Sequence, residues 1–86
     1  MHGEPSIRDD SALLARWARE GNEDAFAELV AQYQRLVLGA ALRRTGDAEL
    51  ARDVAQQVFA TLAAKARTLL GRTNVAGWLY QAASHI

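Results

Sequence analysis

Residues with the side chains that catalysis needs are few and widely spaced in this chain of 86 residues. Its two histidines, His2 and His85, lie at opposite ends of the sequence, so the spacing predicts neither a metal pair nor a nucleophile–histidine dyad. Glu49 and Asp53 form a pair of carboxylates four residues apart, but acids near a helix N-terminus are more simply explained by the helix dipole. The sequence has no glycine-rich phosphate loop. It therefore predicts no enzyme, no cofactor and no metal site.

The segment from Asp53 to Ala66 indicates binding rather than catalysis. As a helix, it carries Asp53, Gln56 and several alanines on one side, where a solvated helix usually carries lysine and glutamate. Small side chains let a second helix approach closely, while a carboxylate and an amide can hydrogen-bond with it. The same alanines are also good helix formers, and composition does not separate these two explanations.

Four helices are expected to position these residues, because apolar residues recur at the spacing of an amphipathic helix. The expected elements are a helix capped by Asp10 or Ser11 and ended by Gly21, a helix from Glu23 to Arg44, a helix capped by Asp47 and ended by Gly71, and a helix from Val75 onward capped by Thr73 or Asn74. The predicted fold class is all-α, a small four-helix bundle over residues 11–86 after a flexible lead-in over residues 1–10. The fourth pattern is still running at Ile86, so we expect a fragment of a longer chain.

The third expected helix has two different sides on a wheel of about 100° per residue. The half expected to face the core holds Leu50, Ala51, Val54, Ala55, Val58, Phe59, Leu62 and Ala66. The opposite half is centred near Ala60 and holds Asp53, Gln56, Ala63, Ala64 and Arg67. Lys65 falls inside the apolar half, and the wheel does not explain it.

Composition limits the class of protein. Half of the residues are apolar, the formal net charge is zero and there is no cysteine, which excludes disulfides and thiolate metal sites and favours the cytoplasm. No apolar run has the length of a signal peptide or a membrane span, so we expect no membrane association. Residues 1–34 carry three arginines against seven acids, and residues 35–72 carry seven basic residues against three acids. Such asymmetry can place a basic surface on a neutral protein.

Three motifs follow one another in an informative order. They are Ala-Phe-x-x-Leu-Val-x-x-Tyr from Ala25 to Tyr33, Ala-x-Asp-Val-x-Gln-x-Val-Phe from Ala51 to Phe59, and Trp78-Leu79. In this order and spacing they resemble region 2 of the bacterial sigma-70 factors, in the extracytoplasmic-function (ECF) group. The resemblance extends from about Leu13 to the end of the chain.

The resemblance implies that the third helix docks on the clamp helices, a coiled coil of the β′ subunit of RNA polymerase. The residues that it marks as polymerase contacts are Asp53, Gln56, Gln57 and Ala60. Many members of the family have glutamate where Gln57 stands, so one charge is missing here. Phe59 lies at the edge of the apolar arc and is assigned first to the core rather than to the polymerase contact.

The fourth helix and the loop before it resemble the part of the family that recognises the promoter minus-ten element. There the non-template single strand is bound with one base extruded from the stack, which needs a basic rim, hydrogen-bonding groups and an apolar support. The residues marked for DNA binding are Arg72, Thr73, Asn74, Tyr80, Gln81, Ser84 and His85. Gly77-Trp78 stands where housekeeping sigma factors have a tryptophan pair, so Trp78 is expected in the core. Many ECF members have asparagine where His85 stands.

A second class of function stays open. The chain is alternatively a helical protein–protein interaction module without a DNA role, whose partner is an anti-sigma-type regulator or a second copy of itself. An incomplete bundle exposes apolar surface, which favours self-association. The polymerase interpretation requires Asp53 and Gln56 to lie outside the bundle.

Overall fold

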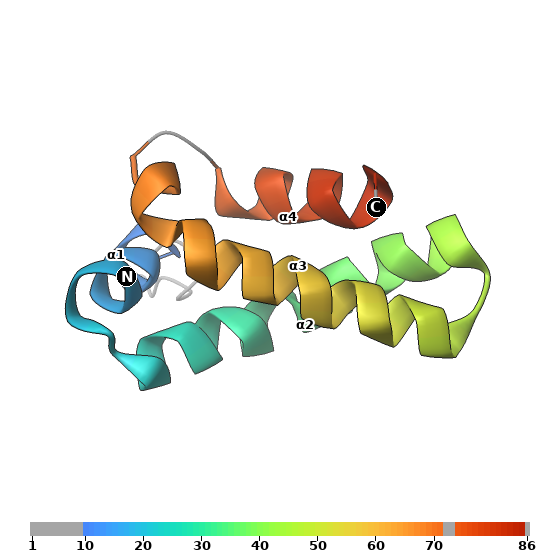
Figure 1. The fold of residues 1–86 in the computed structure, drawn as a ribbon, viewed down its shortest axis with the longest axis horizontal. Helices are drawn as coiled ribbons and strands as arrows, with labels where there is room; N and C mark the ends of the chain where they lie inside the picture. The colour runs from blue at the N-terminus through green and yellow to red at the C-terminus, as the bar shows by residue number, and fades with distance from the viewer. Residues whose placement is uncertain (1–9, 72–73, 86) are drawn as a thin grey trace, which may run out of the picture.

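The computed structural model of the chain describes residues 10–71 and 74–85. Within them it contains four helices and no strand: α1 (Asp10–Glu20), α2 (Glu23–Thr45), α3 (Ala48–Leu69) and α4 (Val75–His85) (Figure 1). The all-α, four-helix prediction is confirmed. None of the described helices is both long enough and apolar enough to cross a membrane.

Local capping explains where the helices begin. The Asp47 carboxylate accepts hydrogen bonds from the backbone amides of Glu49 and Leu50, at 2.8 and 3.1 Å, and so starts α3. Asn74 caps α4 in the same way, since its Oδ1 accepts from the amide of Gly77 at 2.9 Å. Both caps satisfy amides that have no partner inside their helix. The predicted caps Asp47 and Asn74 are therefore confirmed.

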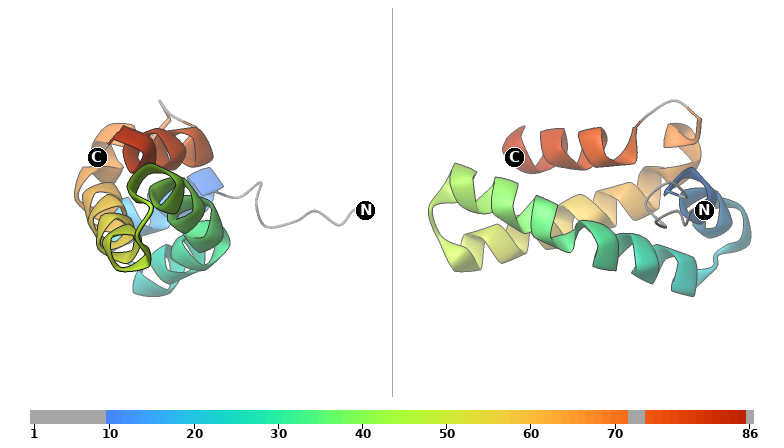
Figure 2. Two further views of the ribbon diagram at one scale, coloured as in Figure 1. Left: turned by 90° about the vertical axis from the view of Figure 1, so that its right-hand side faces the viewer. Right: turned by 180° about the vertical axis from the view of Figure 1, so that it is seen from behind.

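A tight turn joins α2 to α3. Gly46 follows α2 with a φ of 70°, and its amide donates to the carbonyl of Leu42 at 2.8 Å. This left-handed conformation suits glycine, which has no Cβ to clash with the backbone. The turn makes α2 and α3 an antiparallel hairpin, and the hairpin extends past the described end of α4 (Figures 1 and 2).

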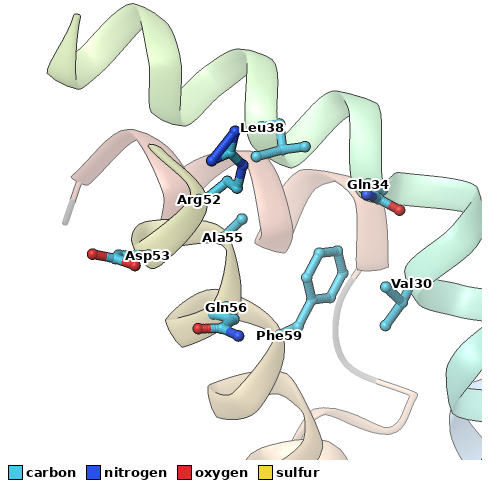
Figure 3. Close-up of a pocket in the computed structure, with 8 residues that line it drawn as sticks. All are labelled: Val30, Gln34, Leu38, Arg52, Asp53, Ala55, Gln56 and Phe59. Atoms are coloured by element: carbon cyan, nitrogen blue, oxygen red, sulfur yellow. The ribbon is translucent and has the colours of Figure 1, made fainter. Parts of the chain in front are cut away.

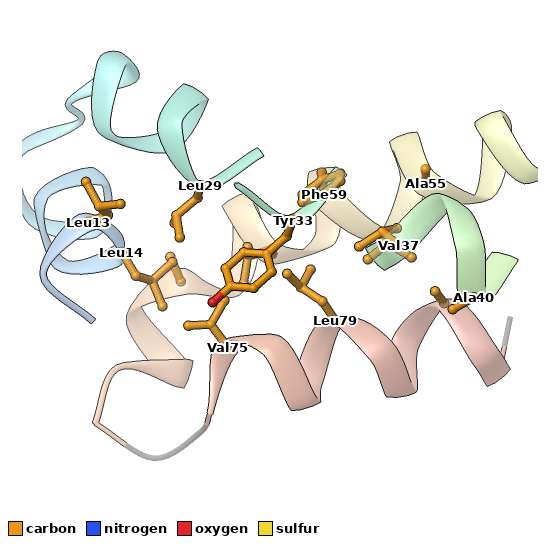
Figure 4. Close-up of a cluster of buried hydrophobic side chains, with 14 of the residues drawn as sticks. Leu13, Leu14, Leu29, Tyr33, Val37, Ala40, Ala55, Phe59, Val75 and Leu79 are labelled. Atoms are coloured by element: carbon orange, nitrogen blue, oxygen red, sulfur yellow. The ribbon is translucent and has the colours of Figure 1, made fainter. Parts of the chain in front are cut away.

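One core lies among all four helices. Its largest fully buried side chains are Leu29 and Val37 of α2, Val58 and Leu62 of α3, and Leu79 of α4 (Figure 4). Leu13 and Leu14 add the contribution of α1. Seven alanines are buried as well, namely Ala25, Ala40, Ala41, Ala51, Ala55, Ala66 and Ala83. Their short side chains let the helix backbones lie close together, as interior packing density requires.

Tyr33 ties the start of α1 to α2. Its ring is buried in the core, and its hydroxyl donates a hydrogen bond to the carboxylate of Asp10. Burial, and then the hydrogen bond and negative charge of Asp10, raise the pKa of the Tyr33 phenol above its usual value. The neutral phenol is thus the form that the folded state holds.

The buried side of α3 is rotated relative to the predicted one. Leu50, which the wheel assigned to the core, is 51% exposed, so this assignment is wrong. The hairpin projects beyond the described end of α4, and no described helix covers that side of the first turn of α3. Lys65 is exposed for a different reason: the buried residues centre on Val58 and Leu62, and Lys65 lies at the margin of that arc. The name sealed side is used here for the buried residues of α3, which are Ala51, Ala55, Val58, Phe59, Leu62 and Ala66.

Candidate functional site

The side of α3 opposite the core is uncovered over its first three turns. Asp53, Gln56, Gln57 and Ala60 are all exposed, and we call these four residues the open face of α3. Among the residues that the structure describes, none of the three polar side chains forms a hydrogen bond or an ion pair. Their donors and acceptors are therefore available to a partner.

A groove of about 490 Å³ borders the open face. It lies between the arms of the hairpin and is called here the α2–α3 groove; it is lined by Val30, Gln34, Leu38, Arg52, Asp53, Ala55, Gln56 and Phe59 (Figure 3). The Phe59 ring projects from α3 toward Val30 and Gln34 of α2. Phe59 is 8% exposed, so its assignment to the core is confirmed. The groove consequently has an apolar floor.

The rim of the groove carries both signs of charge. Arg52 lies beside Leu38, whereas Asp53 points away from α2 (Figure 3). Within residues 10–71 and 74–85 neither of these two side chains forms an ion pair. Gln34 and Gln56 add two amides, both exposed. The arrangement combines an apolar floor with a polar, partner-free rim, as protein–protein interfaces do.

Sequence reasoning missed the α2 wall of this groove. In the sequence, Val30 stood out only as part of the first motif, and no role was predicted for Gln34, Leu38 or Arg52. Both apolar residues are in fact half-buried and pack on the edge of the core. The spacing of four residues from Val30 through Gln34 to Leu38 was a usable signal, since such residues share one side of a helix.

A shallower hollow of about 370 Å³ lies on the other flank of the open face. It is lined by Asp53, Val54, Gln57 and Thr61 of α3. Asp53 therefore stands on a ridge with a hollow on each side. The Thr61 hydroxyl donates to the backbone carbonyl of Gln57 at 2.8 Å, which leaves the Gln57 side chain unengaged.

The open face is shorter than the sequence predicted, because α1 lies against the C-terminal half of α3. The indole Nε1 of Trp17 donates to the carbonyl of Ala63 at 3.0 Å, and Nε of Arg67 donates to the carbonyl of Ala18 at 3.3 Å. We call these two bonds the α1 clasp. Ala63, predicted to be free, is accordingly half-buried. Ala64 and Arg67, on the same side of α3, are exposed as predicted, so α1 covers this side at Ala63.

The residues predicted to bind DNA are only partly brought together. Gln81 and His85 line a hollow of about 310 Å³ with Trp78 and Ala82, and Nδ1 of His85 lies 2.9 Å from the carbonyl of Gln81. Trp78 is half-buried and packs against the core, as predicted, and its remaining surface lines this hollow.

The other predicted DNA-binding residues lie elsewhere. Tyr80 is 47% exposed, about 100° around α4 from Gln81, and does not line the hollow. Ser84 is half-buried, and Asn74 is exposed with its Oδ1 engaged in the helix cap. Arg72 and Thr73 lie outside the described residues. In the described part of the chain, no three histidine, aspartate or glutamate side chains form a group that could hold a metal.

Comparison with known proteins gives one match. The family model described as Sigma-70 region 2 matches residues 29–85, which is more than half of the chain. The matched segment contains the open face of α3, the α2–α3 groove and all of α4. Searches of the curated proteins and of the solved structures returned no match.

Proposed function

The chain belongs to the sigma-70 region 2 family, and from this premise we propose that it is a transcription-initiation domain of the ECF group. It binds the clamp helices of the β′ subunit of RNA polymerase through the open face of α3. It then recognises and helps to melt the promoter minus-ten element through α4 and the loop before it. We place this activity in the cytoplasm, where the polymerase works.

One observation carries the proposal. Asp53 and Gln56, the polar residues of the family motif, are exposed and have no partner within the described residues. An exposed carboxylate and amide with no partner in the bundle can hydrogen-bond with a second molecule. Their availability supports a role in binding another molecule.

The shape of the surface supports a partner made of two helices. The ridge that carries Asp53 has a hollow on each side, formed by the α2–α3 groove and by the surface around Val54 and Thr61. A coiled coil presents two parallel rows of side chains, which suits a ridge flanked by two hollows. The small side chain of Ala60 permits close approach, while Asp53 and Gln56 fix the orientation.

The proposed DNA surface lies on α4. Gln81 and His85 present an amide and an imidazole next to the exposed part of Trp78. These groups can stack on a base and hydrogen-bond to its edge, which is how single-stranded nucleic acid is commonly recognised. Tyr80 lies on another flank of α4, where it would meet a different nucleotide.

The polymerase contact is tested with the clamp-helix segment of β′ as the probe. We expect Asp53→Ala and Gln56→Ala to weaken binding by about fivefold or more each, because a partner donor or acceptor is left unpaired. The measurement is a fluorescence titration on the full chain, with circular dichroism to check helicity. Glu28→Ala, which replaces an exposed acid of α2 that does not line the groove, is the control and should bind as the parent does.

The DNA contact is tested on the complex with core polymerase. Gln81→Ala should weaken binding of a minus-ten non-template oligonucleotide by about threefold or more, given the usual contribution of one hydrogen bond. Glu28→Ala again serves as the control. Unchanged DNA binding, with clamp-helix binding intact, would remove α4 from the interface and leave the alternative of a protein-interaction module.

The exposed apolar side chains are the observation that favours this alternative. Leu36, Leu42, Leu50 and Tyr80 are between 36% and 51% exposed. An anti-sigma-type regulator or a second copy would bury such residues. Sedimentation of the chain alone distinguishes self-association, because its mass would then rise with concentration.

A further inference from the structure

The α2–α3 groove has the size and the lining of a small-molecule site. Its volume of about 490 Å³ lies within the range of about 300–1,000 Å³ that is usual for ligand pockets. Apolar side chains of both helices line it, namely Val30 and Leu38 of α2 and Ala55 and Phe59 of α3. The polar groups are few and lie at its edge, which is the usual arrangement around a bound small molecule.

Arg52 gives one end of the groove a positive charge. Its side chain is exposed and lies beside Leu38 (Figure 3). Glu49 precedes Arg52 by three residues, a spacing at which ion pairs commonly form on a helix. Arg52 nevertheless forms neither an ion pair nor a hydrogen bond with any residue that the structure describes. Because Asp53 points away from α2, the guanidinium is the charged group that a ligand in the groove would meet, and it favours an anion.

The floor of the groove sets the length of the ligand. Arg52 and Phe59 are seven residues apart on α3, which is about 10 Å along the helix axis. Ala55 lies between them, and its short side chain leaves room above the floor. An extended chain of about eight carbons covers this distance, given carbon–carbon bonds of about 1.5 Å. A linear apolar chain with an anionic group at one end therefore matches both the floor and Arg52.

We propose that the α2–α3 groove binds a medium-chain fatty carboxylate, with its carboxylate at Arg52 and its chain over Ala55 toward Phe59. Arginine suits this role, because its planar guanidinium donates two parallel hydrogen bonds to a carboxylate. The exposed amides of Gln34 and Gln56 supply further donors at the edge of the groove. The inference goes beyond the proposed function and does not depend on it, since it involves neither polymerase nor DNA.

The first experiment titrates the full chain with octanoate and follows the heat of binding. We expect saturable binding of one octanoate per chain, and its absence at about 10 mM octanoate overturns the proposal. Octan-1-ol keeps the chain without the charge and should bind at least about threefold more weakly. Butanoate keeps the charge on a shorter chain and should bind at least about tenfold more weakly, because it buries fewer methylenes. Binding of octan-1-ol as tight as that of octanoate also overturns the proposal.

Two substitutions test the position of the carboxylate. Arg52→Gln removes the charge in the groove, and Arg35→Gln is its matched control, since Arg35 is also exposed but does not line the groove. We expect Arg52→Gln to weaken octanoate binding by about threefold or more and to leave octan-1-ol binding within about twofold of the parent, because only the charged end loses its partner. Arg35→Gln should change neither, and circular dichroism checks that both variants keep their helicity.

The outcomes of this comparison are distinct. Octanoate binding that Arg52→Gln leaves unchanged overturns the proposal. Equal losses in the two variants also overturn it, because they indicate a general attraction of anions to basic side chains. A loss confined to Arg52→Gln and to octanoate supports the carboxylate position, because a change in the fold would weaken octan-1-ol binding as well.

A second experiment locates the ligand in the parent chain. Saturating octanoate should shift the backbone amide resonances of groove residues in two-dimensional NMR spectra, most of all those of Leu38, Ala55 and Gln56. Leu50 and Tyr80 are the comparison, because they are 51% and 47% exposed and do not line the groove. Their resonances should shift by less than about half as much, since the chain binds at one place rather than at every exposed apolar side chain. Shifts of equal size at all five positions overturn the proposal.

Discussion

The two sides of α3 differ in what covers them more than in what they are made of. The sealed side includes Ala51, Ala55 and Ala66, each at most 7% exposed, whereas Ala60 on the open face is exposed. The same residue type thus lies at helix–helix contacts on one side and in solvent on the other. The contacts inside the bundle show how closely another helix can approach an alanine on this helix.

The polar residues sharpen the contrast. The described buried residues of the chain include no polar or charged side chain apart from the Tyr33 hydroxyl, which bonds to Asp10. The open face has three polar side chains without a partner in the described residues. Stability should therefore depend on the sealed side, and binding on the open face.

The largest effect expected from this difference is that of Leu62→Ala. Leu62 is 1% exposed at the centre of the sealed side, so truncation removes buried apolar surface and leaves a cavity. The free energy of unfolding should fall by about 3 kcal/mol. Urea denaturation followed by circular dichroism measures it. A loss below about 1 kcal/mol would show that the sealed side is not the core of the domain.

A matched pair places the same substitution on the two sides. Ala66 is 2% exposed, so Ala66→Gln should lower the free energy of unfolding by about 2 kcal/mol through overpacking and burial of an amide. Ala60→Gln on the open face should change it by less than about 0.5 kcal/mol. Thermal melting of the two variants gives the comparison. Similar melting temperatures would contradict the division of α3 into two sides.

A smaller effect concerns pH. Because the pKa of Tyr33 is raised in the folded state, the neutral phenol stabilises the fold below the unfolded pKa of about 10, and this stability is lost as the pH rises above it. Tyr33→Phe should remove this alkaline loss and cost about 1 kcal/mol at pH 8 through the missing bond to Asp10. Urea midpoints at pH 8 and pH 11 test it. An unchanged alkaline slope in Tyr33→Phe would mean that another group causes it.

The helix caps were predictable because they are local. Asp47 and Asn74 accept hydrogen bonds from amides two or three residues away, so their role can be predicted from the neighbouring residues alone. The two sides of α3 were predictable in outline from periodicity. The exposure of Leu50 was not predictable. A helical wheel assigns a side by angle and contains no information about how far α4 extends over the hairpin.

The candidate site was predictable only on α3. Exposure of Asp53 and Gln56 agrees with the motif, although their contacts with a partner stay a prediction. The α2–α3 groove depends on the register in which two helices pack, which no local pattern contains. The partial burial of Ala63 by α1 was missed for a similar reason, because Trp17, which bonds to the Ala63 carbonyl, is 46 residues away in the sequence.

The α1 clasp has a consequence for how the sequence can vary. Both of its bonds end on backbone carbonyls, those of Ala18 and Ala63, rather than on side chains. Every residue supplies such a carbonyl, so replacement of either alanine leaves the acceptor in place. Only the donors, Trp17 and Arg67, are specified by residue type, and mutational tolerance should be asymmetric across this contact.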